Sequence, residues 1–478
     1  MTAQDFLSLL PLLIVSMTIV VGMLAIAFHR SHRLTFWISI IGLALALISL
    51  PYAATFSPRL ITPLFAWDNF AIFYTGLVLA GGLVVTAISF GYLERTAEKK
   101  DEYYLLVLLA TLGSAVLVIS NHFVSFFLGT ELLGLALYPL IAFTPSQRHR
   151  VEAGIKYLIL VGATSAILLF GMALIYAGSG TMQFDQMSSI VSSSAGGSLT
   201  VIGLGLLIAG ISFDLALVPF HMWTPDVYQA APAPITGFIA TVSKGGMFAL
   251  MLRFFSHVAI INGGILWNEF ALIAIASMLV GNILAIVQSN VKRMLAYSSI
   301  AHLGYIMVGF LAGTPLSSPS AVGFYWVIYF ITTLLAFGVI AMISDPLNEV
   351  DDLEAYRGLY WRRSQPAVLF LLALLSLAGL PPVGGLVGKV YLVAVGVQAT
   401  IWLLLAALVI GSVIGIFYYM RVALSMFRKP ELELNAARGG MVTRFVLILL
   451  GGLIVVLGIF PASLIEFVSR MVADLGPR

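Results

Sequence analysis

The feature that most constrains this chain is a succession of apolar runs, each long enough to cross a lipid bilayer as a helix. A membrane-spanning helix needs about 20 mostly apolar residues. Because backbone inside hydrocarbon must satisfy its own hydrogen bonds, the pattern predicts an all-α polytopic membrane protein with about 14 transmembrane helices. The runs are 6–28, 34–53, 70–92, 104–120, 122–143, 153–176, 200–222, 235–256, 268–288, 294–312, 321–343, 367–390, 401–427 and 442–468.

Composition agrees with this class and narrows the chemistry. Only 9% of the 478 residues are charged, against about 25% in an average soluble domain. The chain has no cysteine, which excludes disulfides, cysteine-ligated iron–sulfur clusters and thiol redox chemistry within it. Its seven histidines form no close pair on an expected helix face, so neither a haem nor a zinc site is favoured. The formal charge of +3 comes from basic residues scattered in short loops and does not indicate nucleic acid.

The loops predict an orientation, because cytoplasmic loops carry an excess of Lys and Arg. Loops after even-numbered helices, together with the termini, hold only Arg59, Arg253, Arg470 and Arg478. We therefore expect the loops after odd-numbered helices to be cytoplasmic and both termini to be periplasmic. Those odd loops hold Arg30, Arg33, Arg95, Lys99, Lys100, Arg148, Arg150, Lys292, Arg293, Arg357, Arg362, Arg363, Arg428, Lys429 and Arg438.

One stretch, 211–246, breaks the rules for a membrane helix. Its four prolines remove backbone donors and disfavour helix at the preceding residue. Asp214, His221, Asp226 and Lys244 lie around these breaks. An ionisable group at mid-bilayer costs about 2.5–3.5 kcal/mol on insertion scales, and irregular backbone survives there only against protein or a water cavity. The combination indicates an ion path, although His221 could simply satisfy carbonyls freed by the break.

A second interrupted stretch, 376–389, contains two prolines, four glycines and a lysine. Pro381 lies 162 residues after Pro219, close to the offset of 164 between the expected fourth and ninth helices. Matching broken helices in two inverted halves are typical of transporters with a midplane site. The chain is therefore divided into an N-terminal three-helix segment at 1–103, five-helix units at 104–257 and 268–429, and a C-terminal loop and helix at 430–478.

Four further ionisable residues lie inside expected helices. Glu131 is midway along the fifth helix, and Lys389 directly follows the second break. Both are too deep for snorkelling, which favours a functional role. His302 neighbours polar residues and suits a proton relay, although a histidine there could also bond a neighbouring helix. Lys156 lies barely one turn into the sixth helix, where anchoring and function are equally compatible with its depth.

Three motifs carry a resemblance to a known family. They are LVPFHMWTPDVYQAAPAP with TVSK, then KRMLAYSSIAHLGY, then SLAGLPPVGGLVGKVYLVAVGVQA. Together they resemble the antiporter-like membrane subunits of proton-pumping NADH:quinone oxidoreductase, respiratory complex I. The PFHxWxPDVYxxAPAP form, the helix count and Lys389 favour the N-type, ND-two-like, members over the L- and M-type ones.

The resemblance implies two inverted five-helix repeats, with broken seventh and twelfth helices, around a buried, water-connected axis of charged residues. Lys244 matches the central lysine of the eighth helix, and Glu131 the fifth-helix glutamate. His302 matches the tenth-helix relay histidine, Lys389 the exit-side lysine and Lys156 a sixth-helix lysine. Protons are then expected to enter from the cytoplasm, load Lys244, and leave through waters, His302 and Lys389.

One position departs from the family. The residue before LxLVPFH is normally a lysine that pairs with the fifth-helix glutamate, and here it is Asp214. Two carboxylates would share one site, so one should stay protonated or pair with Lys156 instead. The substitution leaves three readings open: an evolved variant, a unit that no longer pumps, or an introduced change.

The sequence thus predicts a proton-translocating membrane subunit of a bacterial NADH:quinone oxidoreductase, multi-pass in the inner membrane. No cofactor is expected in this chain; flavin, iron–sulfur clusters and quinone are expected in partner subunits. The expected partners are membrane and peripheral subunits, antiporter-like neighbours among them, and the lipid bilayer, but no nucleic acid. Two alternatives remain: a secondary cation/proton antiporter subunit, and a non-pumping assembly scaffold.

Overall fold

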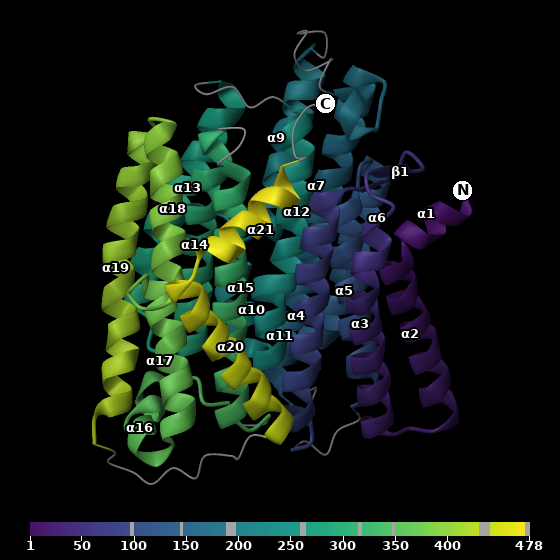
Figure 1. Ribbon diagram of the computed structural model, residues 1–478. Coiled ribbons are helices and arrows are strands. Elements are labelled where there is room, and N and C mark those ends of the chain that lie inside the picture. Colours follow the sequence, from purple (N-terminus) through teal and green to yellow (C-terminus); the bar gives the residue numbers. More distant parts are fainter. Residues whose placement is uncertain are drawn as a thin grey trace.

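The computed structural model describes residues 1–95, 100–143, 147–187, 197–258, 264–313, 318–346, 349–429 and 440–473. Within these ranges the chain forms a helical bundle, with α2 and α3 at the side opposite to α19 (Figure 1). In the described part, 13 helical stretches are long and apolar enough to cross a membrane. Two shorter apolar helices, Ser364–Ala378 and Gly384–Gln398, supply the remaining expected crossing. The prediction of about 14 spans is therefore confirmed.

Short connections join long helices along most of the chain. The elements are α1 Ala3–Ser8, α2 Leu10–Phe28, α3 His32–Ala54, β1 Arg59–Ile61, β2 Phe65–Trp67, α4 Asn69–Leu93, α5 Asp101–Ile119, α6 Phe123–Ile141, α7 Arg148–Ser179, α9 Gly197–Asp214, α10 Trp223–Ala230, α11 Ala233–Phe238, η1 Ile239–Ser243, α12 Lys244–His257, α13 Ile265–Ile286, α14 Val291–Ala312, α15 Ser318–Ile343, η2 Leu353–Tyr356, α16 Leu359–Arg362, α17 Ser364–Ala378, α18 Gly384–Gln398, α19 Trp402–Phe427, α20 Met441–Ile459 and α21 Ala462–Val472.

The boundary between the fourth and fifth spans lies at 120–122, as the sequence indicates. Helix α5 ends at Ile119, and the ring of His122 accepts the backbone N–H of Val124 as α6 begins. The antiparallel strands β1 and β2 pair with each other in the preceding α3–α4 connection, and Phe65 of β2 bridges to Ser120. The turn is thus held by both a helix cap and the small sheet.

The first break shortens an expected helix. The run at 200–222 forms helix only as far as Asp214, because Pro219 cannot donate and disfavours helix at Val218. The chain then turns through Ala216, at φ +59°, into the short helix α10. Trp223 Nε1 donates to the Phe213 carbonyl at 3.0 Å, and Ser277 Oγ accepts the Val218 N–H at 2.9 Å. Side chains therefore satisfy backbone groups that the break frees.

The second break separates α17 from α18. Gly379 ends α17 at φ +78°, a conformation that a side chain strongly disfavours, and the Pro381–Pro382 pair follows. A Cβ at Gly379 would also lie 2.8 Å from Cδ of Lys389. The glycine therefore lets the end of one half-helix approach a charged side chain on the next.

The C-terminal region differs from the expected single span at 442–468. Helix α20 ends at Ile459, before Pro461, and α21 then runs at an angle to it across the bundle (Figure 1). Helix α21 packs against α15 and α4, with Val468 and Val472 buried. The proline removes a donor and turns the chain, so the run contains one span and one lateral helix. The loop at 430–439, where the expected C-terminal segment begins, lies outside the described residues.

The most buried helices lie at the centre of the bundle. In the stretch 233–257, formed by α11, η1 and α12, 100% of the most apolar 18 residues are buried, and in α14 and α15 the corresponding share is 94%. The same share is only 28% in α20 and only 39% in α2 and α3. The outer helices expose apolar side chains, as a lipid solvent permits. Polar side chains on α12, α14 and α15 are therefore removed from lipid.

Candidate functional site

Lys244 stands at the start of α12, directly after the π-helical turn η1. Lys244 is fully buried, and its Nζ donates to Ser299 Oγ at 2.9 Å. The ammonium also lies 5.5 Å from the ring centre of Tyr228, close enough for a cation–π interaction. Tyr329 O–H donates to the same Ser299 Oγ at 2.8 Å. The lysine charge is thus held by one hydroxyl and one aromatic face rather than by a carboxylate.

His302 lies one helical turn beyond Ser299 on α14 and is 3% exposed. Its Nδ1 is 2.7 Å from the hydroxyl of Tyr325, and its Nε2 is 3.1 Å from that of Tyr419. Tyr419 is in turn hydrogen-bonded to Ser298 Oγ. Because residues three and four apart share one helix face, Ser298, Ser299 and His302 form a continuous polar stripe.

Lys389 lies on α18, beyond the second break. Its Nζ donates to the carbonyls of Leu377 and Ala378 at 3.1 and 2.9 Å, so the lysine occupies the exposed carbonyl end of α17. The ammonium is 5.3 Å from the ring centre of Tyr305, whose hydroxyl accepts from Asn282 Nδ2 at 2.8 Å. Lys389 and His302 also lie within electrostatic range of each other.

A small cavity separates the two lysine sites. Its volume is about 10 Å³, roughly the space that one water molecule occupies. Both Ser299, which binds Lys244, and Leu377, whose carbonyl binds Lys389, line it. The full lining is Leu295, Ser298, Ser299, Tyr329, Thr333, Ala336, Phe337 and Leu377. The structure thus brings Lys244, His302 and Lys389 into one buried polar region, in which each side chain has its own hydrogen-bond partners.

The two carboxylates lie in a separate group. Ser165 O–H donates to Glu131, and Asp214 lies within electrostatic range of Glu131. Oδ2 of Asp214 is buried and has no hydrogen-bond partner among the described residues. Lys156 does not pair with Asp214, so that expected alternative is wrong. It extends to the surface, where its side chain is 56% exposed and bonds Glu152 at 2.7 Å, because the two residues are four apart on α7.

His221 is buried at the first break, with 6% of its surface exposed. Within the described part of the chain, neither ring nitrogen bonds to a side chain. The histidine therefore stands apart from the hydrogen-bonded series that contains His302.

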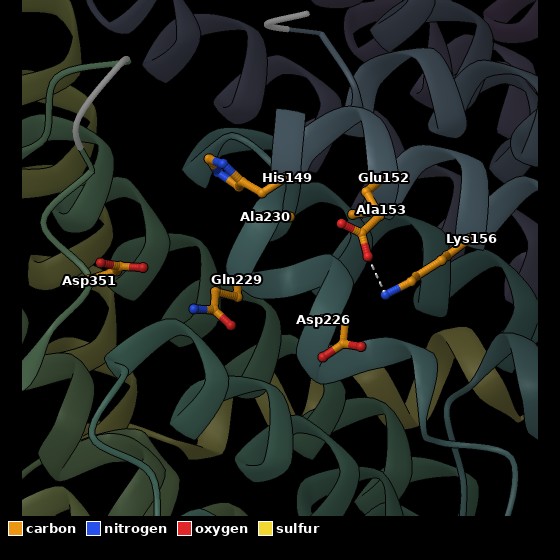
Figure 2. A pocket seen from close by; sticks show the side chains of 8 residues that line it. All are labelled: His149, Glu152, Ala153, Lys156, Asp226, Gln229, Ala230 and Asp351. Atoms are coloured by element: carbon orange, nitrogen blue, oxygen red, sulfur yellow. Dashed lines mark ion pairs between the residues drawn. The ribbon is translucent and has the colours of Figure 1, made fainter. Parts of the chain in front are cut away.

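A cavity of about 440 Å³ opens on the side of α10 that faces away from Lys244. Asp226 and Gln229 of α10 line it, whereas Tyr228, which contacts Lys244, points inward. Figure 2 shows its lining: His149, Glu152, Ala153, Lys156, Asp226, Gln229, Ala230 and Asp351. Asp226 also bonds Arg293 Nη1 at 2.6 Å. One short helix thus separates an acidic surface cavity from the buried lysine.

The tyrosine hydroxyls were not predicted from the sequence. Tyr228, Tyr325, Tyr329 and Tyr419 come from three helices distant in sequence, and each contacts Lys244, Ser299 or His302. Single tyrosines inside apolar runs are common, so no spacing marks them. The available signal was the four-residue interval between Tyr325 and Tyr329, which places both hydroxyls on one face of α15.

Comparison with known proteins gives the family. Residues 120–415, more than half of the chain, match the family described as NADH:quinone oxidoreductase/Mrp antiporter, transmembrane. The chain belongs to this family. A relative in the family, NADH-quinone oxidoreductase subunit N of Ectopseudomonas mendocina (strain ymp), is 44% identical over 484 residues, covering 98% of this chain and 97% of the relative.

Solved structures agree with the family. A chain of respiratory complex I from Thermus thermophilus with bound aureothin is 34% identical, with a TM-score of 0.83 over 95% of this chain and 98% of that one. The fold also matches a chain of the Mrp complex from Dietzia sp. DQ12-45-1b, at 20% identity and a TM-score of 0.87 over 99% of this chain and 98% of that one. An archaeal membrane-bound sulfane sulfur reductase chain matches equally well, at 24% identity, 0.87, and the same coverage.

Proposed function

We propose that this chain is a proton-translocating, N-type membrane subunit of a bacterial NADH:quinone oxidoreductase. The observation that carries the proposal is the buried series that links Lys244 through Ser299 and His302 to Lys389. A proton needs donors and acceptors at hydrogen-bond distance. The structure supplies them around each of the three groups, and bridging water would complete the steps from Ser299 to Ser298 and from His302 to Lys389. The 44% identity to a subunit N along nearly the whole chain supports the assignment to that oxidoreductase.

Lys244 is the loading group in this proposal. Ser299 Oγ accepts from both Lys244 and Tyr329, which occupies its two lone pairs. Its own hydrogen can then point toward the Tyr228 hydroxyl, 3.5 Å away, or into the small cavity. A proton that leaves Lys244 can therefore be passed from Ser299 toward Ser298, Tyr419 and His302 without movement of the backbone.

Lys389 is the release group. The carbonyl end of α17 carries partial negative charge, which favours a protonated lysine there. His302 lies within electrostatic range, so a proton on its ring disfavours the charge on Lys389. A proton that arrives at His302 would thereby promote release from Lys389.

The acidic cavity beside α10 suits proton uptake. Carboxylates at its wall raise the local proton concentration, and only α10 separates it from the Tyr228 face that contacts Lys244. The pattern of Lys and Arg in the sequence favours the cytoplasmic side for this cavity, since Arg148 begins α7 and Arg293 pairs with Asp226 at the cavity wall. Both termini are then periplasmic.

The energy for transport comes from partner subunits. Moving one proton against about 150 mV needs about 3.5 kcal/mol. The chain has no cysteine for an iron–sulfur cluster and no glycine-rich dinucleotide turn, so we assign flavin, clusters and quinone to the partners. Each partner's redox step must therefore reach this chain as a change in charge or conformation.

The two carboxylates act as a modulating pair rather than as carriers. Asp214 lies within electrostatic range of Glu131, at the position where family members of this type normally carry a lysine that pairs with the glutamate. The buried Oδ2 of Asp214 has no hydrogen bond in the described part of the chain. Like charges this close favour one shared proton. The inverted five-helix repeats remain part of this proposal, supported by the matching positions of the two breaks.

The test is the replacement of Lys244 by alanine in the assembled oxidoreductase. Lys244→Ala should leave assembly and redox turnover measurable but lower the protons pumped per electron pair in reconstituted vesicles. Arg470→Ala is the control, because that arginine is exposed on α21, away from both cavities, and pairs with Glu466 four residues before it. We expect the control to pump as the unaltered protein does.

The same measurement separates the alternatives. A scaffold would tolerate Lys244→Ala with an unchanged proton-to-electron ratio, which would refute the proposal. A secondary antiporter would be isolated without redox partners, and its transport would respond to a cation gradient rather than to NADH oxidation.

A further inference from the structure

A buried ion cluster lies at one end of the bundle, away from the series just described. The carboxylate of Glu349, in the segment after α15, forms ion pairs with Lys292 of α14 and, at 3.7 Å, with Arg150 of α7. All three side chains are at most 7% exposed. Tyr92 of α4 donates to Glu349 Oε1 at 2.5 Å. Four segments of the chain therefore meet at one carboxylate.

The cluster also binds backbone at the beginning of the helix that carries Lys244. Glu349 Oε1 accepts the N–H of Ala233, the first residue of α11, at 2.9 Å. Lys292 Nζ donates to the carbonyl of Ala231 at 2.6 Å. The N-terminal amides of a helix lack partners within the helix and favour a negative charge, so Glu349 serves as the cap of this one.

Both helices of the Lys244–Ser299 contact are thus held at the same point. Lys244 lies eleven residues beyond Ala233, or about 16 Å along the helix, and Ser299 lies seven residues beyond Lys292, or about 10 Å. Helices α11 and α12 form one continuous stretch through η1. A displacement at the cluster along either axis would therefore be carried to the hydrogen bond between Lys244 Nζ and Ser299 Oγ.

The charge on Glu349 is stable in this environment. Burial raises the pKa of its carboxyl, but the charges of Lys292 and Arg150, with hydrogen bonds from Lys292 and Tyr92, together hold that pKa below its ordinary value. The titratable groups that interact with it come from several elements: Tyr92 of α4, Tyr103 of α5, His149 and Arg150 of α7, Lys292 of α14 and Tyr356 of η2. Asp351 of its own segment acts on Lys292 and His149. At neutral pH the clamp is therefore ionised.

We propose that Glu349 is a positioning residue for proton transfer: it sets the relative position of the Lys244 helix and the Ser299 helix so that their side chains meet. This inference rests on the proposed function. The sequence placed Lys292 and Arg150 in basic loops, where they would serve only as orientation signals. Their burial against Glu349 assigns them to this clamp instead.

The experiment compares three variants in the purified, intact oxidoreductase. Glu349→Asp keeps the charge but withdraws the carboxylate by about 1.5 Å, the length of one C–C bond. Glu349→Gln keeps the shape and removes the charge. Asp352→Asn is the matched control, because it removes a charge from an exposed side chain in the same segment. Lys244→Ala is prepared alongside.

We measure the number of protons pumped per electron pair as a function of pH, and the amount of assembled complex in each preparation. Glu349→Asp should assemble at the normal amount, pump fewer protons, and shift the pH at which pumping is half-maximal, because the Lys244–Ser299 contact has changed. Combining it with Lys244→Ala should lower the ratio no further. Asp352→Asn should match the unaltered protein.

A role in folding alone would lower the amount of complex and leave the ratio and its pH profile unchanged in what assembles; that result for Glu349→Asp would overturn the inference. If Glu349→Gln fails to assemble, the aspartate variant still decides. Should Lys244→Ala itself leave pumping intact, the proposed function fails. A defect in Lys244→Ala with none in Glu349→Asp refutes the positioning role alone.

Discussion

Removal of the Ser299 hydroxyl is the sharpest test of the relay, because one oxygen serves two buried donors. Ser299 Oγ lies 2.9 Å from Lys244 Nζ and 2.8 Å from the hydroxyl of Tyr329. Ser299→Ala removes that acceptor and adds no atom, so packing around α14 changes little. Both donors then remain in a site from which lipid and bulk water are excluded.

The magnitude follows from the two lost bonds. A buried donor left without a partner costs about 1–3 kcal/mol, and a charged one costs more. The bond to Lys244 is lost at full strength only when the lysine carries the proton, so loading becomes less favourable by at least about 1–3 kcal/mol. Such a change corresponds to about 5- to 150-fold in the equilibrium.

The assay is the proton-to-electron ratio of the reconstituted oxidoreductase, measured with NADH oxidation in the same vesicles. Ser299→Ala should lower the ratio as far as Lys244→Ala does. The control is Ser376→Ala, because the Ser376 hydroxyl pairs with Thr332 at 2.8 Å and is likewise buried. An unchanged ratio in Ser299→Ala, or an equal loss in the control, would refute the assignment of this hydroxyl to the path.

Three further outcomes are expected. Asp214→Lys should raise pumping per electron pair, because it replaces a like-charge contact with Glu131 by an attractive one, whereas Asp214→Asn should change little; abolished pumping in Asp214→Asn would show that the residue is a carrier. Cysteines at Glu354 and Leu60, both exposed, should react with an impermeant thiol reagent only from the cytoplasmic and only from the periplasmic side, respectively; the native chain has no cysteine, and reversed labelling would invert the orientation. The lowered pKa of Glu349 means that its contribution to stability is present above its ordinary, unfolded pKa and is lost as pH falls through the folded value, so thermal unfolding of Glu349→Gln should depend less on pH below about 4.5; equal acid sensitivity in both proteins would contradict this.

Much of the fold could be predicted because membrane spans are a local property. Lipid offers the backbone no hydrogen bonds, so each run of about 20 apolar residues must become a helix wherever it packs. The prolines near 219 and 381 indicated both breaks because the loss of a backbone N–H disrupts the helical turn in which the proline lies. The end of α20 before Pro461 carried this signal too, but apolar residues on both sides concealed it.

The candidate site divides along the same line. Lys244, His302 and Lys389 could be singled out from sequence because charge inside an apolar run is expensive wherever the helix lies. Depth alone left the role of Lys156 open, since rotation about the α7 axis decides whether a side chain faces the bundle or its surface. The contacts of Arg150 and Lys292 could not be predicted for the converse reason: they stand at helix ends, and only the fold buries them against Glu349.

The sequence by itself therefore determined the membrane spans, the two breaks and the three ionisable groups of the central path. Each of these depends on the free energy of a residue in its own segment. The tertiary structure alone decided which hydroxyls bond Lys244 and His302, which acid pairs with Lys292 and Arg150, and which lysine stays at the surface. Those contacts join residues tens to hundreds of positions apart, and their distances depend on how helices rotate and slide against each other, which no local pattern of residues encodes.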